Sequence, residues 1–129
     1  MILVDSSVWI DHFRSWNATF ASLMVDERVL MHPVVIGELL LGGLPTGTPL
    51  RDLQDMTAAA PVDDGEVLLF IQRHSLTGAD IGYGDAHLLA SAQLTTGATL
   101  WTRDRRLRAA AQRLGLDADI EPYGGLHEE

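Results

Sequence analysis

The sequence predicts an α/β protein with a short, mostly parallel central sheet, and three observations support this class. Short, largely apolar runs, typical of strands buried on both faces, occur at residues 2–4, 29–31 and 98–101. The stretches between them carry apolar side chains at helical spacing. Glycine, proline and small polar residues separate the two kinds of stretch. Strands that alternate with helices pair in parallel, because each crossover helix returns the chain to the same end of the sheet.

The helical stretches have clear start and stop signals. Serine, asparagine, aspartate and proline stand where the periodic stretches begin, and glycine stands where several of them end. The first helix is predicted to start at Ser6 or Ser7, and the others to cover residues 17–27, 34–41, 51–60, 64–74, 86–94 and 105–114. A further short strand is predicted around residues 118–121.

Size and composition indicate one domain. The chain has 129 residues with 47% hydrophobic content, which is enough for one core, and we expect a single domain over residues 1–123 with a flexible tail at 124–129. The absence of cysteine excludes disulfides, zinc–thiolate sites and thiol nucleophiles. Neither a basic leader nor an apolar stretch of about 18 residues is found, so a cytoplasmic protein is expected.

The charge distribution narrows the function. The formal net charge is −9, and all nine basic residues are arginine. Without lysine there can be no P-loop, no Schiff-base enzyme and no receiver domain of the usual kind. An acidic surface also disfavours nonspecific binding to nucleic acid, which depends on cationic contacts to phosphates. A nucleic-acid role would therefore need a metal ion or a local basic patch.

Two of the predicted strands end in an acid that precedes a helix. Asp5 follows residues 2–4, and Asp104 follows Thr102 and Arg103 after residues 98–101. In parallel sheets, side chains at the carboxyl ends of strands line the crevice where ligands bind. The alternative is that such an acid only caps the following helix. The repetition of the pattern favours a functional role.

Two further acids stand at unusual places. Glu38 is surrounded by apolar residues within its predicted helix, so its carboxylate needs a cation, a hydrogen-bond partner or an opening to solvent. A buried ion pair with an arginine is the structural alternative. Asp85 stands at the start of a small-residue helix after the glycine-rich stretch 78–84. Asp11 and Asp80 are interpreted as a solvent-facing helix residue and a loop residue.

These acids together predict a divalent-metal site. Four clustered carboxylates oppose their own ionisation, and a set of oxygen ligands without cysteine favours Mg²⁺ or Mn²⁺ over zinc. Such a site suits phosphodiester hydrolysis, because the cation activates water and links an acidic protein to an anionic substrate. The hydroxyls of Ser6 and Thr102 either support a water or phosphate oxygen there or act as caps. Five arginines between residues 103 and 113 form either a local basic patch or a solvated helix face.

Four stretches carry a family resemblance over essentially the whole chain, namely residues 3–11, 32–39, 82–92 and 100–107. In this order they resemble PIN-domain ribonucleases, and more narrowly the VapC toxins of toxin–antitoxin pairs. The resemblance implies a three-layer α/β/α PIN-like fold and a Mg²⁺-dependent endoribonuclease, with Mn²⁺ as a substitute. It also implies a homodimer and a cognate VapB-type antitoxin that holds the toxin inactive. Contact with DNA would be indirect, through the antitoxin, and no membrane would be involved.

The resemblance assigns roles to particular residues. It implies that Asp5 and Asp85 bind the metal, and that Glu38 and Asp104 bind it directly or through water. The implied supporting and RNA-binding side chains are Ser6, Thr102, Arg103, Arg105 and Arg106. The main alternative is a non-catalytic metal-binding or protein-interaction module. A small-molecule phosphohydrolase with Asp5 as nucleophile ranks last, because the lysine that such enzymes usually employ is absent.

Overall fold

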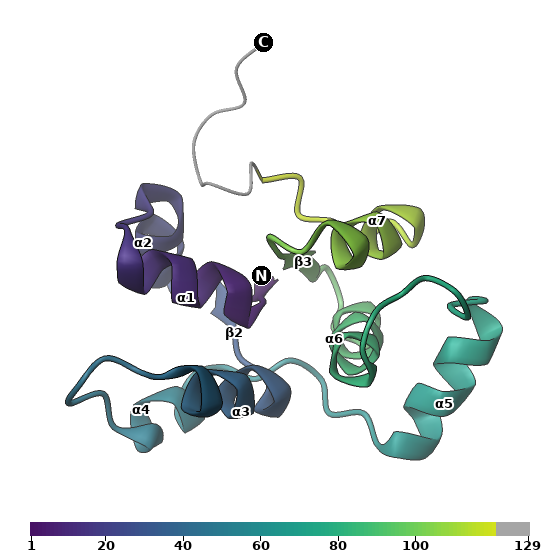
Figure 1. Cartoon of the computed structure of the whole chain (residues 1–129), viewed down its shortest axis with the longest axis horizontal. Coiled ribbons are helices and arrows are strands. Elements are labelled where there is room, and N and C mark those ends of the chain that lie inside the picture. Colours follow the sequence, from purple (N-terminus) through teal and green to yellow (C-terminus); the bar gives the residue numbers. More distant parts are fainter. Residues whose placement is uncertain (121–129) are drawn as a thin grey trace, which may run out of the picture.

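A three-stranded parallel sheet forms the centre of the protein (Figure 1). The computed structural model describes residues 1–120. The strands are β1 (Ile2–Val4), β2 (Val29–Leu30) and β3 (Thr99–Trp101), in the order β2-β1-β3. Ile2 pairs with Val29 on one side and with Thr99 on the other. The first and last strands along the chain are therefore neighbours, and their carboxyl ends meet at one edge.

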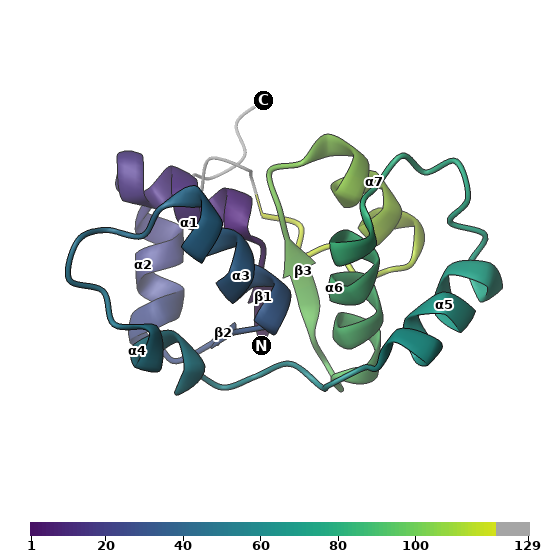
Figure 2. The same ribbon diagram turned by 60° about the horizontal axis from the view of Figure 1, so that its bottom comes forward.

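Seven helices surround the sheet within residues 1–120. They lie in two groups, with α1 to α4 on one side of the sheet and α5 to α7 on the other (Figures 1 and 2). This arrangement confirms the predicted three-layer α/β/α fold with a short parallel sheet. The helices are α1 (Ser6–Arg14), α2 (Ala18–Val25), α3 (Pro33–Gly42), α4 (Leu50–Gln54), α5 (Asp64–Arg73), α6 (Tyr83–Leu94) and α7 (Arg105–Arg113).

The core lies along the two central strands. Leu3, Val4 and Leu100 are fully buried, and Trp101 is 1% exposed. Both faces of the strands are covered by helices, which explains why the strands are continuous apolar runs instead of alternating ones. Burial of such side chains stabilises the fold by about 1.5–3 kcal/mol each, before the loss of conformational entropy is counted.

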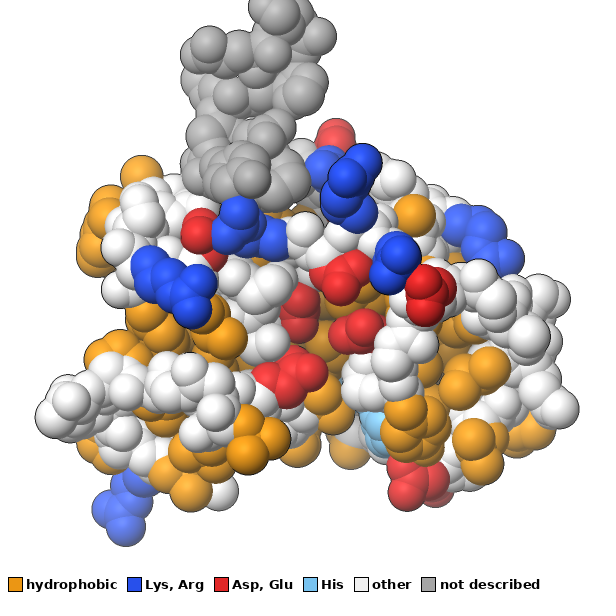
Figure 3. All heavy atoms as spheres, in the orientation of Figure 1, with side chains coloured by type: hydrophobic (Ala, Val, Ile, Leu, Met, Phe, Trp, Pro, Cys, Tyr) orange, Lys and Arg blue, Asp and Glu red, His pale blue; other side chains and the backbone are white. Residues whose placement is uncertain are grey.

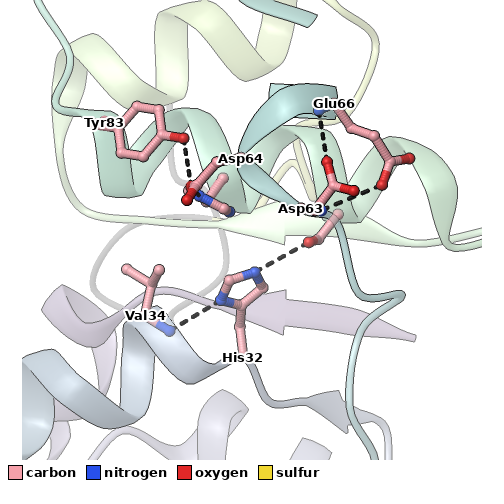
Figure 4. A network of polar contacts seen from close by, with 8 residues as sticks. His32, Val34, Asp63, Asp64, Glu66 and Tyr83 are labelled. Carbon is pink, nitrogen blue, oxygen red and sulfur yellow. Dashed lines mark hydrogen bonds and ion pairs between the residues drawn. The ribbon is translucent and has the colours of Figure 1, made fainter. Parts of the chain in front are cut away.

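Local capping accounts for several helix starts. The side chain of Asn17 accepts from the backbone N–H of Phe20 at the start of α2. Asp63 and Glu66 form a reciprocal capping box at the start of α5, with both hydrogen bonds drawn in Figure 4. Each such cap stabilises a helix by about 1 kcal/mol. The predicted helix starts at these places are confirmed.

The helix predicted for residues 51–60 is much shorter in the structure. The helix α4 ends at Gln54, and Ala58 instead forms a parallel bridge with Met31. The backbone N–H of Met31 donates to Thr57, and the N–H of Ala59 donates to the carbonyl of Met31. These bonds to the chain beyond β2 outweigh the local helical preference, which sequence periodicity alone measures.

The strand predicted at 118–121 is also absent from the described residues. A single bridge joins Leu100 to Asp117, and the N–H of Ala118 donates to the carbonyl of Leu100. Glu121 and the predicted tail 124–129 lie outside the described residues, as does the end of the predicted domain 1–123. Within residues 1–120, no helix combines the length and the apolar character that crossing a membrane requires.

Candidate metal and nucleic-acid site

Asp5 leaves the sheet at the end of β1 and begins α1. Its N–H still donates to the carbonyl of Trp101, at 2.9 Å, so its position is fixed by the sheet. Its Oδ1 accepts the N–H of Ser6 at 2.8 Å, which makes it the N-cap of α1. The capping interpretation is therefore right about this contact. It does not account for Oδ2, which accepts hydroxyls from two other residues.

Those hydroxyls belong to Ser7 and Thr102. Ser7 Oγ lies 2.8 Å and Thr102 Oγ1 lies 2.7 Å from Asp5 Oδ2. Thr102 is 1% exposed and Asp5 is 5% exposed, so the carboxylate is held in a nearly closed polar pocket at the sheet edge. The sequence predicts supporting roles for Ser6 and Thr102 but not for Ser7, because the contacts of the Ser7 hydroxyl are made with residues far along the chain.

Glu38 reaches the same edge from α3. The Ser6 hydroxyl donates to Glu38 Oε1 at 2.8 Å, which links α1 to α3. Ser6 thus holds a second acid instead of acting only as a cap. The carboxylate is half-buried, and within residues 1–120 no arginine forms an ion pair with it. Among its apolar neighbours, the Glu38 carboxylate is therefore stabilised by the Ser6 hydroxyl and by its partial exposure to solvent.

Asp85 lies in the first turn of α6. Its Oδ2 accepts the N–H of Gly82 at 3.3 Å. The pKa of Asp85 is raised to about 6, mainly by burial and then by the negative charges of Asp5, Asp104 and Glu38, while the Gly82 hydrogen bond acts in the opposite direction. Burial is the largest cause of this shift, and the contributions of three other carboxylates show that their charges lie near Asp85.

Gly84 controls how closely α6 approaches α3. A Cβ atom at this position would stand 3.0 Å from Cγ1 of Val34, which is tighter than ordinary van der Waals contact. Since α3 carries Glu38 and α6 carries Asp85, this close approach brings the two helix-borne acids to the same place.

Asp104 is the N-cap of α7. Its Oδ1 accepts the N–H groups of Arg106 at 2.9 Å and Leu107 at 3.0 Å, and its own N–H donates to Thr102 Oγ1 at 3.0 Å. Its side chain is exposed. The predicted repeat of strand, acid and helix is therefore present at both β1 and β3.

The four acids lie near one another, since the charges of three of them raise the pKa of Asp85, and the acidic face is hollowed at its centre (Figure 3). Figure 3 shows acidic side chains gathered at the centre of this face, between α1 and α3 on one side and α6 and α7 on the other. An all-oxygen donor set with mutual repulsion fits Mg²⁺ or Mn²⁺. Within residues 1–120, no three His, Cys, Asp or Glu side chains form a ready-made metal cluster. A cation here would therefore be held by one or two carboxylates, with water completing its shell, as is usual for Mg²⁺.

Arginines line the rim of this hollow. Arg103 forms an ion pair with Asp11, and Arg106 pairs with Asp80 at 3.0 Å. Arg105 is exposed, like Arg106. The prediction that Asp11 faces solvent is wrong, since its side chain is 24% exposed and is held by Arg103. Asp80 is a loop residue as predicted.

A second polar network joins the helices that carry Glu38 and Asp85. His32 is the N-cap of α3, and its Nδ1 accepts the N–H of Val34 at 3.0 Å (Figure 4). Nδ1 is therefore the unprotonated nitrogen, and Nε2 donates to Ser91 Oγ on α6, at 3.0 Å. Burial and, to a smaller extent, the neighbouring His87 together lower the pKa of His32 to about 4. No role of His32 was predictable from the sequence, because its partner Ser91 lies 59 residues further along the chain.

The class of protein follows from this architecture and from comparison with known proteins. The model of the PIN domain matches residues 2–113, so the chain belongs to the PIN-domain family. Among curated relatives, it is 44% identical over 117 residues to "Ribonuclease VapC32" of Mycobacterium tuberculosis, in strains CDC 1551 / Oshkosh and ATCC 25618 / H37Rv. The match covers 90% of this chain and 94% of the relative. No solved structure matches it significantly.

Proposed function

We propose that this protein is a divalent-metal-dependent endoribonuclease, the toxin of a type II toxin–antitoxin pair. The observation that carries the proposal is the convergence of Asp5, Glu38, Asp85 and Asp104, with the pKa of Asp85 raised to about 6. Folding brings these charges together against their repulsion, which a bound cation relieves. The name of the 44% identical relative supports RNA as the substrate.

The four acids would bind the ion in two ways. Asp5 and Asp85 would bind it directly, and Glu38 and Asp104 would do so directly or through water. When bound, Mg²⁺ or Mn²⁺ lowers the pKa of water and neutralises charge on the phosphate undergoing attack. Ser6 orients Glu38 by its 2.8 Å hydrogen bond.

The protein's own residues also position the RNA. Arg105 and Arg106 are exposed beside Asp104, where they can contact phosphates on either side of the scissile bond. Arg103 lies deeper and is held by Asp11, so it orients the rim of the site as well. Thr102 accepts the N–H of Asp104 and donates to Asp5, which keeps two acids in register.

The proposal extends to partners and place. A VapB-type antitoxin would cover the acidic hollow and hold the enzyme inactive, and a basic side chain on it would complement the net charge of −9. The toxin would act as a homodimer in the cytoplasm and would contact DNA only through the antitoxin. Its single domain would extend over residues 1–123.

The test is cleavage of total cellular RNA by the purified, antitoxin-free chain with Mg²⁺, with Mn²⁺ and with EDTA. Discrete fragments should require metal and disappear in Asp85→Asn. The matched control is Asp26→Asn, an exposed acid at the other end of the sheet, just before β2, which should cleave like wild type. A folded chain that binds metal but cleaves no RNA would instead support the binding-module function. Cleavage that survives in Asp85→Asn would show that the site is misplaced.

A further inference from the structure

The ends of β1 and β3 are tied together by two hydroxyls. The parallel ladder ends where the N–H of Asp5 donates to Trp101, at 2.9 Å. Beyond this bond, the segment after β1 turns into α1 and the segment after β3 turns into α7. The sheet ladder does not extend to these two turns. Ser7 from the first turn and Thr102 from the second fill this gap, with their oxygens 3.3 Å apart.

The direction of each hydrogen bond in this gap is determined. The N–H of Arg103 donates to Ser7 Oγ at 3.0 Å, and the N–H of Asp104 donates to Thr102 Oγ1 at 3.0 Å. A backbone N–H can only donate, so both hydroxyl oxygens are acceptors there. The single proton of each hydroxyl is therefore available for donation. Ser7 donates to Oδ2 of Asp5 at 2.8 Å, and Thr102 donates to the same oxygen at 2.7 Å.

This pattern fixes the Asp5 carboxylate in its plane. Oδ2 accepts two hydroxyls while Oδ1 accepts the N–H of Ser6, so rotation about the side-chain bonds would break three hydrogen bonds at once. The same Ser7 hydroxyl holds the N–H of Arg103, one residue before Asp104. Ser7 therefore acts on two acids, on one by contact and on the other through the turn that carries it.

We propose that Ser7 is a positioning residue of the carboxylate site, which orients Asp5 and holds the turn that carries Asp104 in register with it. The inference rests on the proposed metal-dependent function and deepens it. Groups that orient metal ligands typically change metal affinity by about 10–100-fold when removed. Ser7→Ala removes none of the four acids. A loss of Mn²⁺ affinity in this variant would therefore report a change in how the acids are positioned.

The test is a titration of the metal-free full-length chain with Mn²⁺, in which bound Mn²⁺ is measured directly and not through RNA cleavage. We expect Ser7→Ala to weaken Mn²⁺ binding about tenfold, and Ser7→Thr, which keeps the hydroxyl, to stay within about twofold of wild type. Ser7→Cys, with a weaker donor of similar size, should fall between them and serves if Ser7→Ala does not fold. The amide hydrogen of Arg103 should exchange faster in Ser7→Ala.

A matched control separates positioning from stability. Thr95 Oγ1 also accepts a backbone N–H, from Ala60 at 2.8 Å, and donates to the carbonyl of Ser91, but it caps the far end of α6. Thr95→Val should lower thermal stability as Ser7→Ala does, with unchanged Mn²⁺ affinity. Equal affinity in Ser7→Ala and wild type would overturn the inference and leave the proposed function intact. A wild-type chain that binds no Mn²⁺ and cleaves no RNA would overturn the proposed function itself.

Discussion

The acids that follow strands and the acids carried by helices differ in how they are held. Asp5 and Asp104 each accept at least two hydrogen bonds from backbone or hydroxyl donors. Glu38 accepts one from Ser6, and Asp85 accepts one long bond from Gly82. The pKa shift appears on Asp85, which has few donors to offset burial and repulsion. The strand-end acids are thus held firmly by several donors, whereas the helix-borne acids are held by one donor each.

The largest expected effect is a contrast between Asp5→Asn and Asp85→Asn. Both should lower metal-dependent RNA cleavage by about 100-fold or more, because each removes a metal-binding charge. Their stabilities should move in opposite directions. The amide NH₂ of Asn at position 5 would face groups that themselves donate hydrogen bonds to Asp5, which costs about 1–3 kcal/mol of stability. An amide at position 85 instead removes the repulsion between Asp85 and the other carboxylates, which raises stability. Thermal unfolding of the metal-free variants checks this, and an equal loss of stability in both would contradict the comparison.

The second prediction concerns the spacing of the helix-borne acids. Gly84→Ala places a methyl group 3.0 Å from Val34 and should push α6 away from α3. Better helix propensity offsets the strain by about 1 kcal/mol, so stability should change little. Cleavage should fall about tenfold, since displacing a ligand costs affinity much as loss of its supporting groups does. The double variant Val34→Ala with Gly84→Ala should recover cleavage, and failure to do so would exclude spacing as the cause.

The third prediction concerns acid stability. The folded pKa of His32 is about 4, against 6.5 in an unfolded chain, so the unfolded state binds the proton more readily between these values. The resulting contribution to stability is complete above pH 6.5 and is lost as pH falls toward 4. The residue is 5% exposed, and with allowance for relaxation around the charged ring we expect about 1–2 kcal/mol. His32→Asn keeps a capping side chain and should flatten this part of the stability curve measured by urea unfolding.

The smallest effect is the opposite pH dependence of Asp85. Its folded pKa of about 6 lies above the unfolded value of 3.8, so protonation favours the folded state. The contribution of Asp85 is complete below pH 3.8 and is lost as pH rises through 6. We expect about 1 kcal/mol after allowance for solvent screening, in the metal-free chain. Comparing urea unfolding of wild type and Asp85→Asn at pH 5 and 7 isolates it, and no difference between the two pH values would contradict it.

The strand-end acids were predictable because their signal is local. A buried apolar run that ends in Asp5, and another that leads through Thr102 to Asp104, places each acid at the sheet edge without knowledge of the partner strand. Glu38 was identified by its contrast with apolar neighbours. The convergence of all four acids followed from the parallel topology that the strand and helix pattern predicted.

The remaining features depend on contacts between distant residues. Ser7 looks like a cap until Arg103, 96 residues later, donates to it. Asp11 looks solvent-facing until the same arginine reaches it. The helix predicted to extend to residue 60 ends early because Thr57 and Ala59 form backbone hydrogen bonds with Met31 instead. Periodicity and propensity describe neighbours in sequence, so they could not reveal these pairings.

The pairing of β1 with β3 also bears on synthesis of the protein. Thr102, the partner of Asp5, lies 97 residues after it in the chain and therefore leaves the ribosome much later. A nascent chain that ends before β3 lacks Asp104, the hydroxyl of Thr102 and the strand that fixes Asp5. The four acids can therefore come together only after β3 and the turn that follows it have been synthesised.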